Sequence, residues 1–148
     1  MKSITKFTLL IWVSIFLIGC KISIRQDGKL SFLQPDGSVI TSINIEIAET
    51  PGSREKGLMD RGLSDFKNGM LFVFQDVEPR TFWMRNTPTS LDIIFVAEDL
   101  RIVNIAQNTT PMSDQLYSSE FPAKYVVEVK AGFTERYGLK KGNKIRLK

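Results

Sequence analysis

The chain carries at residues 39–48 the stretch Val-Ile-Thr-Ser-Ile-Asn-Ile-Glu-Ile-Ala, and its alternation of apolar and polar side chains decides the fold class. Ile43, Ile45 and Ile47 would share one face of an extended strand, because successive side chains of a strand point to opposite sides. Asn44 and Glu46 would share the other face. The period of two therefore predicts a β-strand that packs one face against a core.

Short segments of similar character follow along most of the chain. They predict further strands at residues 70–74, 80–85, 91–96, 100–106, 125–130 and 144–147, with a polar, irregular stretch at 109–122. Thr50 can cap a helix that begins at Pro51 and runs to about Met59. A helix or a turn is expected at 63–67, and a short helix at 133–137. These elements predict a β-rich α+β domain with two or three short helices and a compact antiparallel or mixed sheet, either open or closed wholly or partly into a barrel.

The first twenty residues have the composition of an export signal. Lys2 and Lys6 precede an apolar run over residues 7–18, which is shorter than the roughly 20 residues that span a bilayer core. Gly19 and Cys20 follow this run, and the segment resembles a bacterial lipoprotein signal. That resemblance implies that residues 1–19 are removed and that Cys20 carries lipid. An ordinary signal peptide, or a short anchor with an incidental cysteine, is the alternative.

A lipoprotein signal implies an exported protein that is tethered to a membrane of the cell envelope. The outer membrane is favoured where there is one, because Lys21 rather than an aspartate follows the cysteine. Residues 20–37 are expected to be a tether, which either is a disordered stalk or carries a small hairpin around Asp27 and Gly28. Residues 38–148 are expected to form one globular domain with its own core.

The composition excludes several kinds of chemistry. The 148 residues include no histidine and one cysteine, so a Ser-His-Asp triad, a Cys-His pair, a Cys/His zinc site and an internal disulfide cannot form. The net charge of +4 comes without a long basic block. Neither a nucleic acid partner nor a cofactor is therefore expected.

Several ordered motifs carry a resemblance to a known family. They are Gly-Leu-Met-Asp-Arg at 57–61, Gly-Met-Leu-Phe-Val-Phe at 69–74, Trp-Met-Arg-Asn-Thr at 83–87, Leu-Asp-Ile-Ile-Phe at 91–95, Glu-Val-Lys-Ala-Gly at 128–132 and a glycine at 142. With these motifs, residues 43–147 resemble the domain-of-unknown-function family 192, a group of mostly exported prokaryotic domains. The resemblance implies a compact β-rich α+β fold, and it implies no particular activity.

Two carboxylates fall on faces of predicted strands that are otherwise partly apolar. Asp92 shares its face with Ile94, and Glu128 shares its face with Val126. A buried charge needs a partner, so the structural explanations are ion pairs with Arg61 and Arg85, or capping of the turn at 86–87 by Asp92. The functional alternative is one cleft in which Asp92 and Glu128 divide acid and base roles while Arg61 orients an anion.

Other residues in the motifs are weaker candidates for a site. Asn86 and Thr87 precede a proline, where their side chains either bond to the local backbone or form a polar lip that binds a ligand. Trp83, among several phenylalanines, is expected in the core rather than in a pocket for an apolar or sugar ligand. Three methionines within the motifs could bind Cu(I), although methionine more often fills gaps in a core; they are Met59, Met70 and Met84.

The sequence favours recognition over catalysis. The first hypothesis is a lipid-anchored envelope domain that binds a small ligand or an envelope protein. The second is a hydrolase or lyase that uses Asp92 and Glu128, which should then lie in one open cleft. The third is a structural spacer, which should have neither a cleft of this kind nor a pocket.

Overall fold

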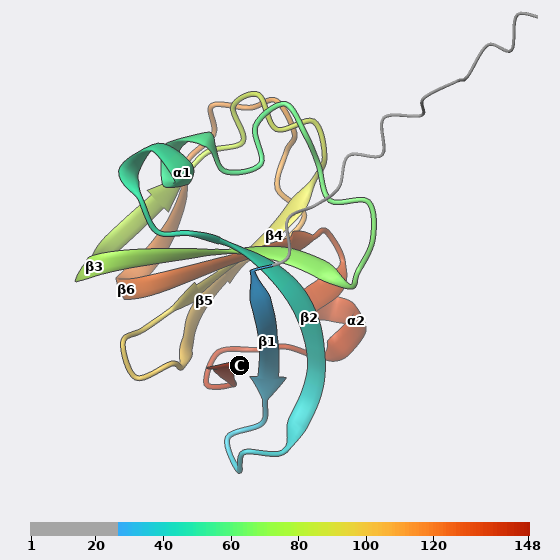
Figure 1. Ribbon diagram of the computed structural model, residues 1–148, viewed down its shortest axis with the longest axis vertical. Helices are drawn as coiled ribbons and strands as arrows, with labels where there is room; N and C mark the ends of the chain where they lie inside the picture. Colours follow the sequence, from blue (N-terminus) through green and yellow to red (C-terminus); the bar gives the residue numbers. More distant parts are fainter. Residues whose placement is uncertain (1–26) are drawn as a thin grey trace, which may run out of the picture.

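The computed structural model describes residues 27–148, and the signal segment with Cys20 lies outside the described residues. The described part contains seven strands and two short helices (Figure 1). The strands are β1 (Gly28–Leu33), β2 (Val39–Ala48), β3 (Asn68–Phe82), β4 (Leu91–Val96), β5 (Ile102–Ala106), β6 (Tyr117–Lys130) and β7 (Lys144–Leu147). The helices are α1 (Pro51–Lys56) and α2 (Phe133–Tyr137).

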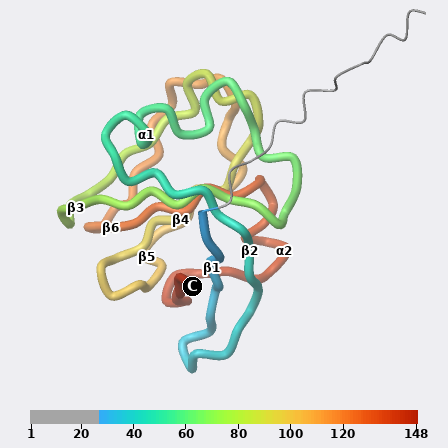
Figure 2. Tube along the Cα trace, viewed as in Figure 1, coloured from blue at the N-terminus to red at the C-terminus, as the bar shows by residue number. Residues whose placement is uncertain are grey.

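All seven strands belong to one curled sheet in the order β5-β4-β6-β3-β2-β1-β7 (Figure 2). The β2–β3 pair is parallel and the other pairs are antiparallel, so the sheet is mixed. The two edges approach each other where Arg101 forms a bridge with Lys144 and the Ile102 amide donates to the Asn143 carbonyl at 2.8 Å. The predicted β-rich α+β fold is confirmed, and the sheet forms a half-barrel.

The sheet buries apolar side chains on both of its faces. On one face, Phe133 of α2 covers the concave core. On the other face, Leu58, Leu63 and Met84 from the loops cover the sheet. Every residue of β4 is buried, which explains why this strand has a continuous apolar sequence with one carboxylate. Among residues 27–148, no helix is long and apolar enough to cross a membrane.

Strand β1 lies N-terminal to the domain boundary that the sequence suggested at residue 38. It pairs with both β2 and β7, and its residues Leu30 and Phe32 are fully buried in the core. The turn that joins β1 to β2 is at 34–38, where Gly37 has a φ of +90°. Gly28 lies within β1 opposite Ile45, so it does not form the turn of the expected hairpin. The structured domain therefore includes residues that the sequence assigned to the tether.

Strands β3 and β6 are longer than the sequence predicted. The expected strands at 70–74 and 80–85 are parts of one bent strand that ends at Phe82, and β6 begins at Tyr117 within the stretch expected to be irregular. The buried Arg80 stabilises the bend, because its guanidinium donates to the Asp76 and Ala123 carbonyls and pairs with the carboxylates of Asp76 and Glu78.

Helix α1 has the capping box that Thr50 and Ser53 form with their side chains and backbone amides. It ends at Lys56 rather than near Met59, because Gly57 leaves the helical conformation with a φ of +42°. The segment at 63–67 forms a turn and not a helix. Helix α2 lies where the sequence predicted it.

Candidate functional site

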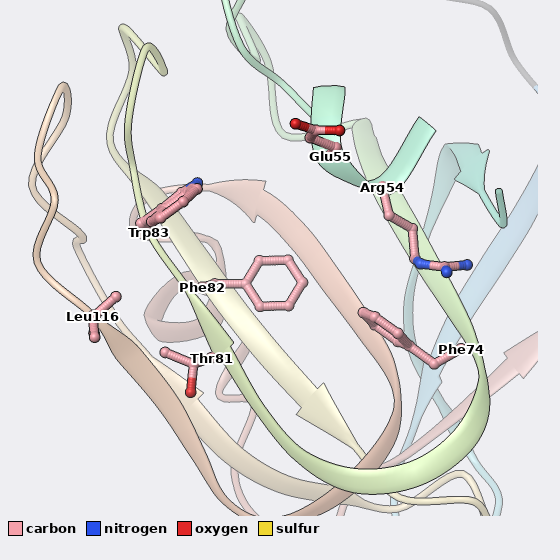
Figure 3. A pocket seen from close by; sticks show the side chains of 7 residues that line it. All are labelled: Arg54, Glu55, Phe74, Thr81, Phe82, Trp83 and Leu116. Atoms are coloured by element: carbon pink, nitrogen blue, oxygen red, sulfur yellow. The ribbon is translucent and has the colours of Figure 1, made fainter. Parts of the chain in front are cut away.

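An open groove of about 430 Å³ lies between α1 and the end of β3 (Figure 3). The aromatic residues Phe74, Phe82 and Trp83 line it. Trp83 is 43% exposed although it is the largest side chain of the region. The remaining lining residues are Arg54, Glu55, Thr81 and Leu116.

A much smaller cavity of about 40 Å³ adjoins this groove, since both are lined by Arg54, Glu55, Phe82 and Trp83. The small cavity also contacts the segments of four motifs on which the family resemblance rests. These contributions are Gly57, Leu58 and Met59 from the motif at 57–61, Phe72 from that at 69–74, Thr87 from that at 83–87, and the buried Glu128 from that at 128–132.

Backbone hydrogen bonds hold the loops of these motifs together. The Asp60 amide donates to the Asn86 carbonyl at 2.8 Å, which joins the loop after α1 to the loop after β3. Asn86 has a φ of +54°, a left-handed conformation that asparagine adopts more readily than most residues. The Thr87 hydroxyl donates to the Arg85 carbonyl at 3.4 Å. Thr87 thus bonds to local backbone as the structural interpretation predicted, and it also lines the small cavity.

Glu128 lies on β6 and is 5% exposed. Across residues 27–148, no hydrogen bond or ion pair joins its carboxyl group to another residue. Burial alone raises the pKa of Glu128 from 4.5 to about 8, because the charged form loses its hydration without gaining a partner. An isolated carboxyl with a raised pKa beside a cavity is typical of a functional site.

Asp92, by contrast, has hydrogen-bond partners within the fold. It is fully buried, and its carboxylate accepts hydrogen bonds from the amides of Asn108, Gly132 and Thr134 and from the Thr134 hydroxyl. Two of these amides lie at the N-terminus of α2, so Asp92 caps this helix from β4. The partner of this carboxylate is therefore backbone and hydroxyl rather than arginine.

Asp92 and Glu128 do not share a cleft. Glu128 pairs directly with Ile93, and directly opposed residues of an antiparallel pair lie on the same face of a sheet. Asp92, as the neighbour of Ile93, therefore points to the opposite face. The carboxylate pair that a hydrolase or lyase would require is not assembled in this structure.

Arg61 also fails to join either carboxylate. It forms a bidentate ion pair with Glu46 of β2 at 2.9 and 2.8 Å, and it donates to the Gly57 carbonyl. Glu46, Met70 and Glu128 lie in one row across β2, β3 and β6, so Arg61 is bound two strands away from Glu128. Arg85 pairs with Asp114 instead, at 2.7 Å.

The remaining candidates fall into two groups. Trp83 lines the groove and its ring stacks on the Arg85 guanidinium at 4.1 Å, so the expectation that it belongs to the core is wrong. Met70 and Met84 are buried in one apolar cluster, whereas Met59 lines the small cavity. Packing in the core is the interpretation that the sequence favoured for these methionines over Cu(I) binding, and Met70 and Met84 are packed in this way.

Sequence reasoning missed several residues of the groove. Arg54 and Glu55 were assigned only to a helix, and Leu116 lay in the stretch expected to be irregular. Leu116 is 64% exposed. Its exposure indicates an apolar surface patch only together with the residues that lie beside it in space, and the sequence does not show these.

The fold and the site define a β-rich half-barrel domain with an aromatic groove and a buried, unpaired carboxyl beside it. Residues 32–147 match the family DUF192, described as "Uncharacterized ACR", and the chain belongs to this family.

Two solved structures of bacterial proteins are similar to the chain. One, from Sinorhizobium meliloti 1021, is provisionally described as a transcription regulator; it is 33% identical, with a TM-score of 0.77 over 81% of this chain and 92% of the other. The other is a protein of unknown function from Novosphingobium aromaticivorans DSM 12444; it is 35% identical, with a TM-score of 0.74 over 80% of this chain and 83% of the other. No curated protein matches the chain.

Proposed function

We propose that this domain binds a small, largely apolar molecule in the groove, without catalysis, while a lipid on Cys20 tethers it to the cell envelope. The observation that carries the binding proposal is the adjacency of an aromatic groove to a cavity at which several family motifs meet. A structural spacer would require neither feature.

The size and the walls of the groove support a small ligand. Its volume of about 430 Å³ lies in the range of pockets that enclose small molecules. Phe82, Phe74 and Trp83 offer aromatic surface that an apolar or ring-containing ligand can contact, and such contacts add free energy beyond the burial of area. The buried Glu128 lines the small cavity that adjoins the groove and gives the site a polar anchor.

Replacement of the exposed Trp83 by alanine tests the binding proposal. A library of small aromatic and aliphatic compounds is screened by protein-observed NMR, and the dissociation constants of all hits are measured. Trp83→Ala should weaken these hits by about tenfold or more, since aromatic contacts and buried area are lost. Val39→Ala is the matched control, because Val39 is an exposed apolar residue at the far end of β2. If the hits bind both variants as tightly as they bind the wild type, the groove is not the binding site and the proposal is refuted.

The lipid anchor is supported by the sequence alone, through the basic residues, the apolar run and Cys20. Several acyl chains on one residue would hold the domain at a membrane much more firmly than one chain. Cys20→Ser should therefore move the protein from the membrane fraction to the soluble fraction and abolish labelling with a radioactive fatty acid. Persistent labelling in the variant would contradict the anchor.

A further inference from the structure

We infer that the small cavity binds a primary ammonium group, with Glu128 as its counter-ion, while the adjoining aromatic groove holds the apolar remainder of the ligand. This inference rests on the proposed function and names the class of ligand, an amine with an apolar or aromatic body. Three features of the described residues carry it: the unpaired carboxyl, the pairing of the nearby cationic donors with other acceptors, and the aromatic walls.

The first feature is the isolation of Glu128. Its side chain is 5% exposed and contacts the cavity, yet no described residue donates a hydrogen bond to it. The other buried carboxylates of the domain have several donors: Asp92 accepts four hydrogen bonds, and Glu46 has the bidentate ion pair with Arg61. Glu128 is thus the exception, and a group in the cavity can supply what the fold does not.

The second feature is that the cationic and hydroxyl donors around the cavity already have acceptors. The Lys56 ammonium pairs with Asp60 at 2.6 Å, the Thr87 hydroxyl donates to the Arg85 carbonyl, and the Arg54 guanidinium donates to the Val73 carbonyl at 3.1 Å. The amides of Gly57 and Met59 donate within the turn that ends α1. Acceptors remain: the carboxyl of Glu128, the lone pairs of the Thr87 hydroxyl and the thioether of Met59. Neither these donors nor the Trp83 indole N–H donates to Glu128, so the carboxyl can accept from the head group of a ligand that donates.

The third feature is the affinity of the surrounding rings for cations. The Arg85 guanidinium lies 4.1 Å from the centre of the Trp83 ring, and two further guanidinium groups, of Arg54 and Arg80, lie over Phe74 at 5.0 and 4.0 Å. Aromatic faces attract cations. The cavity of about 40 Å³ also has room for only two or three atoms of water size, which suits an ammonium group and excludes a bulky head group.

The charges near Glu128 define how binding should depend on pH. Glu55, Arg54 and Lys56 line the cavity from α1, the Glu46–Arg61 ion pair lies along the same sheet face on β2, and Lys130 lies two residues further on β6. Burial raises the pKa of the Glu128 carboxyl to about 8. An amine binds the ionised carboxyl, so its affinity should rise as the pH increases from 6 toward about 8. A ligand that accepts a hydrogen bond from the protonated carboxyl would show the opposite trend.

The experiment compares three probes of nearly equal shape: phenethylamine, phenethyl alcohol and phenylacetate. Dissociation constants are measured by NMR between pH 6 and 8.5 for the wild type and for four variants. Phenethylamine should bind wild-type protein about ten- to a hundredfold more tightly than the alcohol at the upper pH. Glu128→Gln should remove this preference and its pH dependence. Glu55→Gln, which neutralises the exposed carboxylate of the rim, tests the rim as a competing position for the cation. Glu135→Gln, which neutralises an exposed carboxylate of α2 outside the groove and the cavity, is the matched control and should keep both the preference and its pH dependence.

Each other outcome separates this inference from the proposed function. If Trp83→Ala weakens all three probes equally and the amine has no preference, the groove stands and the ammonium site is overturned. A preference that survives in Glu128→Gln and disappears in Glu55→Gln places the cation at the rim, which also overturns the inference. If no probe binds and the compound library gives no hit that depends on Trp83, both proposals fail. A carboxyl NMR titration in which phenethylamine does not lower the pKa of Glu128 would count against the site even if Glu128→Gln unfolds.

Discussion

Replacement of Asp92 by asparagine should destabilise the domain strongly although the side chain keeps its shape. The carboxylate accepts from the Asn108 amide at 2.9 Å and the Gly132 amide at 3.3 Å through Oδ1. Through Oδ2 it accepts from the Thr134 amide at 2.9 Å and the Thr134 hydroxyl at 2.7 Å. An asparagine presents an oxygen to one of these pairs and an NH2 group to the other. Whichever orientation it adopts, at least one buried backbone N–H faces a donor.

The size of the effect follows from these contacts. A buried donor without an acceptor costs about 1–3 kcal/mol, and a hydrogen bond to a charged group contributes about 1.5–3 kcal/mol. The Thr134 hydroxyl offers little relief, because it already accepts from the Gln107 amide at 2.8 Å. We expect Asp92→Asn to lower the free energy of unfolding by about 3 kcal/mol, which is a large part of the about 5–15 kcal/mol of a typical domain.

Urea denaturation followed by far-UV circular dichroism measures this loss directly. Asp114→Asn is the control, because Asp114 is an exposed aspartate that pairs with Arg85 on the surface, where ion pairs contribute little. The slope of free energy against urea should stay the same in both variants, so that a shifted midpoint reports stability alone. A loss for Asp92→Asn below about 1 kcal/mol would refute the capping role, since no arrangement of these four contacts permits so small a cost.

Three further changes test other parts of the structure. Burial raises the pKa of Glu128 from 4.5 to about 8, so between these pH values the folded domain keeps a proton that the unfolded chain releases. The free energy of unfolding should therefore fall as the pH rises through this window, by at most about 1.4 kcal/mol per pH unit. Glu128→Gln should flatten this pH profile in urea titrations. Gly69→Ala should cost about 2 kcal/mol in the same assay, because its Cβ would lie 2.8 Å from the Glu128 carbonyl, which the sheet holds in place; a neutral result would show that β3 can move. Arg61→Met should lower the free energy of unfolding by about 2 kcal/mol, because it leaves Glu46 unpaired. The double variant Arg61→Met with Glu46→Gln should recover most of this loss. Additive losses in the two single variants would contradict the ion pair.

The sequence predicted those parts of the fold in which local pattern and burial agree. The alternation in β2 places Ile43 and Ile45 in the core and leaves Glu46 on the other face, as expected. The pattern failed where long-range contacts decide the structure. β1 begins with a glycine and a lysine, contains one serine and follows a short polar segment, so only its pairing with β2 and β7 shows that it belongs to the sheet. The first part of β6 was missed for the same reason. Its sequence is polar, and only its pairing with the end of β3, far along the chain, shows that it is a strand.

The candidate site was only partly predictable, because strand register does not appear in the sequence. Asp92 and Glu128 were each correctly expected on a partly apolar strand face, and both are buried. Whether they face each other depends on the pairing of β4 with β6, in which Ile93 lies opposite Glu128. A slip of one residue in this register would exchange the faces and put both carboxylates on one side. The observed register instead gives Asp92 the amides of α2 and leaves Glu128 alone beside the groove. Since the fold satisfies one carboxylate and not the other, recognition of a ligand, rather than paired acid–base chemistry, is the use that this arrangement favours.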